Sequence, residues 1–416
     1  MRVTTALNRM LAIAGATVAR IVFTPQGIVI GLRRRAKKLQ CPACGLRTRA
    51  AYDRSVRRWR HLDLGASRLW LEAEVRRLHC RRCDRVLTEE VPWARPGARH
   101  TRDVEDLVAW CAKRMDKTTV ARLLRVSWEA VARIVTRVVA EAIDDYRLDE
   151  LYRIGVDEIS YRSEHRYLTV VADHDRGGAV VWAAEGKDAA TLGSFFAELG
   201  EERTSILQAV TLDMGAAYIK AVEDAKRLLG LRATVAFDPF HVVRLANEAV
   251  DKARRWAWNE ARRSGDAGAR WVKRARWALV KDPGRLSTSQ RLTLEELRKT
   301  GSVLYRAWQL KEGLREVYRM AVFGVAASQQ FLDRWLAWAC RSRIPSFVRL
   351  SKTIRKHRKG ILAAIELGLS NSKLEGLNSK IRLINHRGYG HHSAKALIAM
   401  IYLCCGGITV ELPTGR

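Results

Sequence analysis

The middle of the chain has the clearest pattern of apolar and polar positions. Three short runs rich in apolar and β-branched residues, 154–159, 166–172 and 179–184, are joined by tight polar turns and predict three antiparallel strands. Strand and helix signals then alternate. They predict a helix over 189–199, a strand over 209–212, a helix over 216–229, a strand over 234–237 and a further helix from Pro239. The pattern therefore predicts an α/β domain.

Three antiparallel strands followed by alternating helices and strands is the element order of a ribonuclease H-like domain. We assign residues 151–250 plus 366–416 to this domain. Between them, residues 251–365 carry no strand signal and are basic and rich in tryptophan, which predicts an all-α insertion domain. The predicted fold class is α/β, with two smaller modules in front of the catalytic domain.

The first 150 residues divide into three parts. Residues 1–38 form a basic, partly β lead-in, residues 39–92 form a compact unit with paired cysteines at both ends, and residues 93–150 are helical. Within 117–138, two short helices separated by a turn have the shape of a helix-turn-helix, and Ser127 is placed to cap the second helix. Helical hairpins in ordinary bundles have the same pattern, so the neighbouring modules and the charge decide in favour of DNA docking.

The paired cysteines form two Cys-x-x-Cys motifs, which predict a zinc ribbon. Each motif presents two thiolates, and two motifs together complete a tetrahedral Zn²⁺ shell. Four thiolates leave no open position, so this zinc has a structural role. The alternatives are free structural cysteines or a redox pair, and the thioredoxin-like context that a redox pair needs is missing. The four expected zinc ligands are Cys41, Cys44, Cys80 and Cys83.

The charge of the chain indicates a polyanionic partner. Lys and Arg number 75 against 44 Asp and Glu, a net charge of +31. Because the positive charge comes in runs, double-stranded DNA is a better explanation than a solvated surface. No apolar segment approaches the roughly 18–20 residues needed to span a bilayer, and no signal-peptide pattern is present. We expect a cytoplasmic, nucleoid-associated protein without a membrane partner.

Three acids stand in settings that favour metal binding. Asp157 and Asp213 lie at the ends of predicted strands, and Glu375 lies on an amphipathic stretch near the C-terminus. Taken singly, each has an ordinary interpretation as a turn cap or a solvated residue. Taken together, they are the oxygen ligands that a pair of Mg²⁺ (or Mn²⁺) ions needs for phosphodiester chemistry. Other acids compete for this role, and Asp238 is the strongest of them.

The sequence closely resembles bacterial DDE transposases of the ISL-three family of insertion sequences, from about Gln40 almost to the C-terminus. The resemblance rests on specific words in a fixed order: CPACG, YDRSVRRWRHLDL, LHCRRC, GVDEISYRSEHRYLTVVADHD, WAAEGKDAATLGSFF, LDMGAAY, FDPFHVVRLAN and NSKLEGLNSKIRLINHRGYGHHSAKAL. One departure is His386, where relatives often carry Arg; it affects a phosphate contact and leaves the acids unchanged.

The resemblance implies roles for individual residues. Asp157, Asp213 and Glu375 fall on the catalytic, metal-binding triad of the family. Asp238 and His241 fall on an Asp/Cys-x-x-His motif beside the active site, although His241 could equally be a packing residue at the start of a helix. Asn378 and Arg382 fall on the acid-bearing helix near the DNA.

The implied reaction is metal-dependent cleavage at the terminal inverted repeats, followed by joining of the freed 3′-hydroxyl ends to target DNA, with a homodimer expected on the DNA. Two alternatives stay open, a non-catalytic DNA-binding regulator and a structure-specific nuclease. The basic residues expected to contact DNA are Arg33, Arg34, Arg35, Lys37, Lys38, Arg57, Arg58, Arg60, Arg122, Arg125, Arg133, Lys380 and Arg387.

Overall fold

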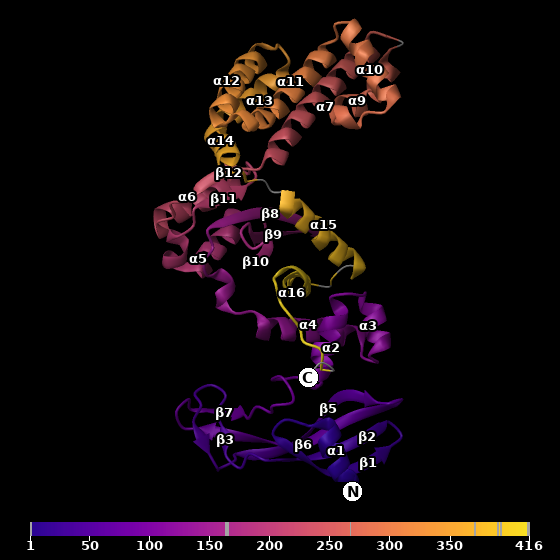
Figure 1. The fold of residues 1–416 in the computed structure, drawn as a ribbon, viewed down its shortest axis with the longest axis vertical. Coiled ribbons are helices and arrows are strands. Elements are labelled where there is room, and N and C mark those ends of the chain that lie inside the picture. Colours follow the sequence, from indigo (N-terminus) through magenta and orange to yellow (C-terminus); the bar gives the residue numbers. More distant parts are fainter. Residues whose placement is uncertain are drawn as a thin grey trace. The chain divides into compact units, whose positions relative to one another are not determined.

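The computed structural model describes residues 2–162, 166–266, 268–369, 372–388, 391 and 393–413, except the side chains of residues 372 and 373. Asn371, which opens the C-terminal motif, lies outside these residues. The chain divides into two compact units, one made of Met1–Asp144 and Leu383–Arg416 and the other of Asp145–Arg382 (Figure 1). Among the helices that these residues form, none is both long and apolar enough to cross a membrane.

A five-stranded mixed sheet organises the second unit. Its strands are β8 (Arg153–Arg162), β9 (Arg166–Asp173), β10 (Ala179–Glu185), β11 (Ala209–Leu212) and β12 (Thr234–Phe237). Their spatial order is β10-β9-β8-β11-β12. The first three strands in the sequence pair antiparallel, whereas β11 runs parallel to both β8 and β12. All five strands predicted from the sequence are confirmed.

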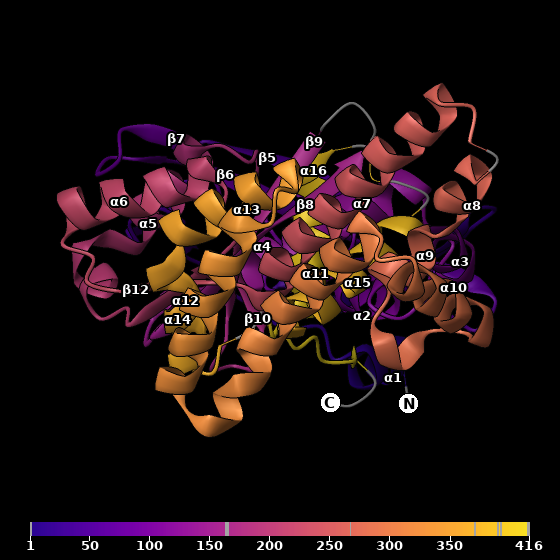
Figure 2. The same ribbon diagram turned by 90° about the horizontal axis from the view of Figure 1, so that it is seen from above.

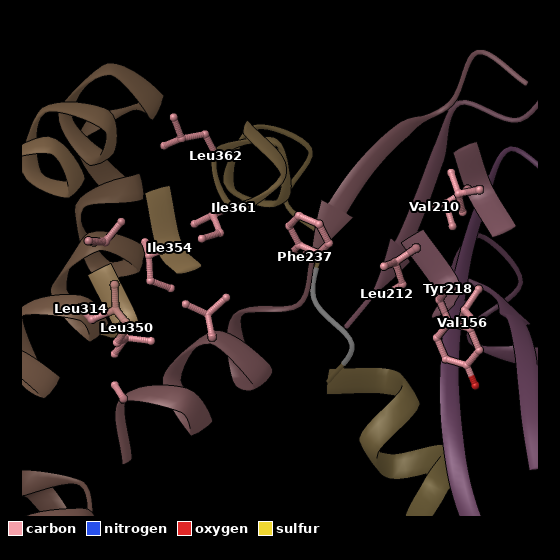
Figure 3. Close-up of a cluster of buried hydrophobic side chains, with 14 of the residues drawn as sticks. Val156, Val210, Leu212, Tyr218, Phe237, Leu314, Leu350, Ile354, Ile361 and Leu362 are labelled. Carbon is pink, nitrogen blue, oxygen red and sulfur yellow. The ribbon is translucent and has the colours of Figure 1, made fainter. Parts of the chain in front are cut away.

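Helices α5 (Ala189–Ser205) and α6 (Ala216–Leu229) pack against each other and against the sheet. The Asp188 side chain caps α5 by accepting a hydrogen bond from the Thr191 N–H, and Gly230 ends α6 in a left-handed conformation that a residue with a side chain rarely adopts. Figure 3 shows Val156, Val210 and Leu212 of the strands together with Tyr218 of α6 in one buried cluster.

The described residues between β12 and position 369 form helices and no strand, in agreement with the helical pattern of their sequence. In Figure 2, α11 lies alongside α7. The buried cluster of the sheet continues into these helices through Leu314 of α11, Leu350 and Ile354 of α13, and Ile361 and Leu362 of α14 (Figure 3). The α-helices of this region are α7 (Pro239–Arg263), α8 (Ala269–Arg274), α9 (Arg276–Val280), α10 (Thr288–Lys299), α11 (Val303–Arg319), α12 (Val325–Arg341), α13 (Pro345–Lys356) and α14 (Arg358–Glu366).

A second sheet forms much of the first unit. Its main path is β1 (Ala16–Thr24), β2 (Gly27–Arg34), β6 (Ser67–Cys80) and β5 (Asp53–Leu64), and β7 (Arg85–Thr88) pairs with β6. Helix α1 (Val3–Leu11) packs on β1, and β3 (Leu39–Gln40) pairs with β4 (Arg47–Thr48). The boundary predicted at residue 38 falls inside this unit, because β2 before it pairs directly with β6 after it.

Helices α2 (Arg102–Ala112), α3 (Lys117–Leu123) and α4 (Trp128–Ala142) complete the N-terminal part of the first unit. Ser127 caps α4 by accepting a hydrogen bond from the Ala130 N–H, as the sequence predicts. Helix α16 (Ala394–Cys405), which the sequence analysis assigned to the catalytic domain, packs against α4 instead. Its apolar residues therefore stabilise the helical module.

One close approach ties α15 (Ser372–Arg387) to the sheet. Leu374, at the start of this helix, is fully buried, and Figure 1 shows that end of α15 next to β8. A Cβ atom built on Gly155 of β8 would lie 2.7 Å from Leu374 Cδ1 and 2.9 Å from His174 Nε2. His174 is fixed in turn by a 2.6 Å hydrogen bond to the Thr211 hydroxyl. Only a glycine leaves room for both side chains.

We predict that Gly155→Ala lowers the free energy of unfolding by about 1–3 kcal/mol, because the added methyl group overpacks a buried contact. Gly193→Ala is the matched control, since Gly193 lies inside α5 with nothing within 4 Å of its Cβ position. That control should be more stable by about 0.5–1 kcal/mol. Urea unfolding measures both. Equal stability of the Gly155→Ala and wild-type proteins would contradict the assigned contact.

Candidate active site and zinc centre

The parallel strands deliver acids to one edge of the sheet. In the register of β11 on β8, Thr211 lies opposite Gly155, so Asp213 and Asp157, each two positions further on, continue the same register. Phe237 of β12 lies opposite Leu212, so Asp238 and Asp213 follow directly on from this pair. Asp213 and Asp238 directly follow the ends of β11 and β12, whereas Asp157 lies midway along β8 and not at a strand end, where the sequence analysis placed it. Because the three strands run parallel in this register, their carboxylates converge at one edge of the sheet.

Helix α15 adds the fourth carboxylate. Leu374 is buried against Gly155, which places the adjacent Glu375 beside the same sheet edge. One turn along, the Asn378 Nδ2 donates a hydrogen bond of 2.5 Å to Asp157 Oδ2. The other oxygen of Asp157 accepts a hydrogen bond of 2.8 Å from the Glu158 N–H. Asp157 is therefore held from two sides, and α15 is joined to β8 by both an apolar and a polar contact.

Burial and mutual repulsion shift the carboxyl groups. Burial, aided by the negative charge of Asp213, raises the pKa of Asp157 above its ordinary value. Burial, aided by the charges of Asp238 and Asp157, likewise raises the pKa of Glu375. In both cases His241 opposes the shift. These acids are thus close enough to feel one another, and a positive charge among them would relieve the repulsion.

Asp238 and His241 lie beside these acids, at the start of α7. Asp238 is almost fully buried, and its Oδ2 lies 3.7 Å from His241 Nδ1. Both residues line the same cavity as the triad. The structure thus brings together all seven residues that the sequence analysis placed at or beside the active site, including Asn378 and Arg382.

The cavity at this edge has a volume of about 550 Å³ and a polar lining. The acids line it together with two arginines, Arg244 of α7 and Arg382 of α15. Two aromatic residues, Phe240 and Tyr167, complete the walls, and Phe240 is 53% exposed. The sequence analysis missed Arg244, Phe240 and Tyr167. Phe240 and Arg244 belong to the FDPFHVVRLAN motif, where a spacing of one helical turn from each other was the available signal.

The donor set of this cavity fits hard divalent cations. Carboxylate oxygens are the ligands that Mg²⁺ and Mn²⁺ prefer. The Glu375 Oε1 atom is buried without a hydrogen-bond partner among the described residues, as expected for an oxygen meant for an ion. The triad is less tightly gathered than the cysteine set, which alone among the described residues has three or more ligand atoms within 4.8 Å of one another.

The four predicted zinc ligands form that cysteine set. The sulfur of Cys41 lies 3.9 Å from that of Cys83, and the sulfur of Cys44 lies 3.5 Å from that of Cys80. A tetrahedral shell with Zn–S bonds of about 2.3 Å would separate its sulfurs by about 3.8 Å. Burial raises the pKa of the Cys80 thiol, but backbone N–H groups of Cys83 and Arg82 and the neighbouring thiols outweigh it and lower the pKa to about 6. The geometry and the ready thiolate both fit Zn²⁺.

The basic residues predicted to contact DNA differ in accessibility. Arg60 is buried and pairs with Asp63, and Arg34 pairs with the buried Glu89, so neither presents a free guanidinium. Arg387 is half-buried. Two of the exposed arginines are also held by internal acids, Arg58 by Glu72 and Arg125 by Asp63. The exposed members are Arg33, Arg35, Lys37, Lys38, Arg57, Arg58, Arg122, Arg125, Arg133 and Lys380.

We predict that Cys41→Ser combined with Cys80→Ser removes bound zinc and unfolds the ribbon, because each half of the shell loses a thiolate. Metal analysis of the purified protein should show about one zinc per chain in the wild type and none in this variant. The matched control is Cys340→Ser, an exposed cysteine on α12, which should keep its zinc. Full zinc content in the double variant would rule the site out.

Three family models each match one module of the chain. A model described as a transposase matches residues 154–401, more than half of the chain. A model described as the helix-turn-helix domain of transposase family ISL3 matches residues 89–139. A third, described as the zinc-finger of transposases IS204, IS1001, IS1096 and IS1165, matches residues 37–83.

Curated relatives agree with these models. The chain is 42% identical over 412 residues to the transposase for insertion sequence element IS1557 of Mycobacterium tuberculosis, a match that covers 93% of this chain and 90% of the relative. It is 27% identical over 366 residues to the transposase for insertion sequence element IS1001 of Bordetella parapertussis, covering 87% of each. The chain therefore belongs to the ISL3 family of insertion-sequence transposases.

Proposed function

We propose that this transposase cleaves DNA at the terminal inverted repeats of its insertion sequence and joins the freed 3′ ends to target DNA. The observation that carries the proposal is the convergence of Asp157 of β8, Asp213 after β11 and Glu375 of α15 on one polar cavity. The strand order β10-β9-β8-β11-β12, with its antiparallel and parallel halves, supports a ribonuclease H-like catalytic domain.

The triad residues would hold two Mg²⁺ or Mn²⁺ ions, which when bound would activate the attacking oxygen and stabilise the leaving oxygen of an in-line displacement. In the first displacement a water oxygen bonds to phosphorus and the 3′-oxygen of the transposon end leaves. In the second, that 3′-hydroxyl attacks a target phosphodiester, a new P–O bond forms and the target 3′-oxygen leaves. Both displacements have the same geometry at phosphorus, so one cavity serves both.

Neighbouring residues position the triad and the substrate. Asn378 orients the Asp157 carboxylate through its hydrogen bond, and Leu374 fixes the height of Glu375 above the sheet. Arg244 and Arg382, on opposite helices, place positive charge where a phosphate would enter an otherwise acidic cavity. His241, beside Asp238, is positioned to orient the substrate strand.

DNA binding would be shared between the zinc ribbon and the helix-turn-helix module. The second helix of such a module enters the major groove, which assigns α4 as the recognition helix. Two transposon ends must be held together for joining, so a homodimer on DNA follows from the proposed reaction. A DNA substrate also places the protein in the bacterial cytoplasm, at the nucleoid.

We predict that Asp157→Asn, Asp213→Asn and Glu375→Gln each lower end cleavage by at least about 10³-fold, since each removes an ion ligand worth several kcal/mol in the transition state. The assay uses purified protein, Mg²⁺ and a plasmid that carries the element encoding this chain. Asp175→Asn is the matched control, because Asp175 pairs with Arg153 in a turn outside the cavity. Unchanged cleavage by a pure triad variant would reject the assignment, and wild-type binding without cleavage would favour a DNA-binding regulator.

We also predict that Asp157→Asn stabilises the metal-free protein at neutral pH. The pKa of Asp157 in the folded protein lies above its ordinary value. Its unfavourable contribution to the free energy of unfolding is therefore absent at pH values below the ordinary pKa and fully present at pH values above the raised pKa. The advantage of the variant should therefore vanish as the pH falls towards 4. Mg²⁺ should reverse this order of stability, since Mg²⁺ at about 100 times its Kd adds about 2.7 kcal/mol to the free energy of unfolding of the wild type only. Thermal unfolding in EDTA and in Mg²⁺ measures this, and equal Mg²⁺ stabilisation of both proteins would be the contrary result.

A further inference from the structure

A second polar cavity lies in the first unit, within the N-terminal module. It has a volume of about 230 Å³, opens to the surface and lies between residues 97–100 and one face of helix α4. Its polar lining consists of Arg99, His100, Arg133 and Arg137, and no acid is among its lining residues. We call it the arginine cavity. None of its lining residues belongs to the triad cavity or the zinc centre.

The segment side of the arginine cavity is held rigidly by backbone hydrogen bonds. The Arg60 N–H of β5 donates to the Arg99 carbonyl at 2.9 Å, and the Thr101 N–H donates to the Arg60 carbonyl at 2.9 Å. His100 thus forms a parallel bridge with Arg60. The Thr101 hydroxyl also bonds to His61 Nδ1 at 2.9 Å, inside the core. The backbone of Arg99 and His100 is therefore fixed in place before any ligand arrives.

The helix side is fixed by a buried ion-pair network. Glu105 of α2 is fully buried, and its carboxylate lies 3.0 Å from the Arg137 guanidinium and 3.4 Å from that of Arg95. Arg137 is thus anchored from behind the cavity. Arg133, one turn earlier on α4, is mostly exposed, and its guanidinium lies 3.9 Å from the exposed carboxylate of Glu129. The charge of Arg137 is thus balanced by Glu105, whereas Arg99 and the exposed Arg133 bring positive charge to a cavity whose lining contains no acid.

His100 lies among the arginines that line the cavity. The pKa of His100 is lowered to about 4, mainly by burial and additionally by the positive charges of four surrounding arginines, Arg137, Arg60, Arg133 and Arg99. His100 is therefore neutral at physiological pH and offers a ring nitrogen as a hydrogen-bond donor or acceptor. A concave, positively charged surface with preorganised donors is the arrangement that binds a phosphate group.

We propose that the arginine cavity binds a backbone phosphate of duplex DNA and so sets the position of α4 on the double helix. The inference rests on the proposed function, since it assumes that the helix-turn-helix module docks on DNA. Guanidinium groups bind phosphate oxygens through paired hydrogen bonds, and a contact to the backbone carries no sequence information. The arginine cavity would therefore fix register and orientation, while the exposed residues of α4 read the bases.

The test measures equilibrium binding of the full-length protein to a mixed-sequence 30-base-pair duplex in EDTA, across a range of salt concentrations. Arg99→Gln combined with Arg133→Gln should raise the Kd about tenfold at physiological salt. It should also reduce the slope of log K against log salt by about 0.9, the value for one neutralised phosphate. The single variant Arg133→Lys keeps the charge and should keep the wild-type slope.

A matched control removes the same charge elsewhere in the unit. Arg2→Gln combined with Arg9→Gln alters two exposed arginines outside the arginine cavity, the zinc ribbon and the helix-turn-helix module, and should leave the slope unchanged. Zinc content and circular dichroism confirm that each variant is folded. If the double variant is not folded, the single variant Arg133→Gln, at a side chain that is 66% exposed, replaces it in the test.

The outcomes separate this inference from the proposed function. A slope that falls only in the Arg99 and Arg133 variants supports the phosphate site. Wild-type binding with an unchanged slope in those variants, or an equal fall in the control, overturns it and leaves the proposed function standing. A wild-type protein that does not bind duplex DNA at all removes the proposed function and this inference together. Because EDTA prevents cleavage, the result does not depend on the triad.

Discussion

The parallel pairing of β11 with β8 on one side and β12 on the other is the constraint on which the site depends. It fixes the register that carries Asp157, Asp213 and Asp238 to one edge of the sheet, although more than fifty residues separate the first two along the chain. The contact of Leu374 with Gly155 then brings the acid-bearing helix to the same edge. A shift of one residue in either pairing would turn a carboxylate to the opposite face.

Gathering these buried acids in one cavity has an electrostatic cost. Burial and neighbouring charges raise the pKa values of Asp157 and Glu375, so the metal-free site is unfavourable in the native state. Such a group of acids is retained where function requires it. The whole chain carries a net charge of +31, which under the proposed function would attract the DNA whose phosphates the acids would process through bound cations. The acidic cavity and the basic surface are thus complementary parts of one design.

Much of this architecture could be predicted from the sequence because its signals are local. The strands and helices between 153 and 263, the Ser127 cap and the zinc ligands follow from periodicity, caps and spacing within short windows. What could not be predicted depends on pairing between distant segments. The lead-in strand β2 joins β6, α16 packs on α4, and Arg60 is buried although it stands in a basic run. The arginine cavity could not be predicted either, because it forms between a loop and a helix from separate parts of the sequence.

The central claim is that Asp157, Asp213 and Glu375 bind cations together. The most direct measurement is a structure of the protein with its transposon-end DNA and Mn²⁺, with the ions located by anomalous scattering. We predict two peaks in the cavity beside Asp157 of β8 and Asp213 after β11, bound by oxygens of all three carboxylates and next to a DNA phosphate. Peaks elsewhere, or the three carboxylates pointing apart around an ion-free phosphate, would contradict it.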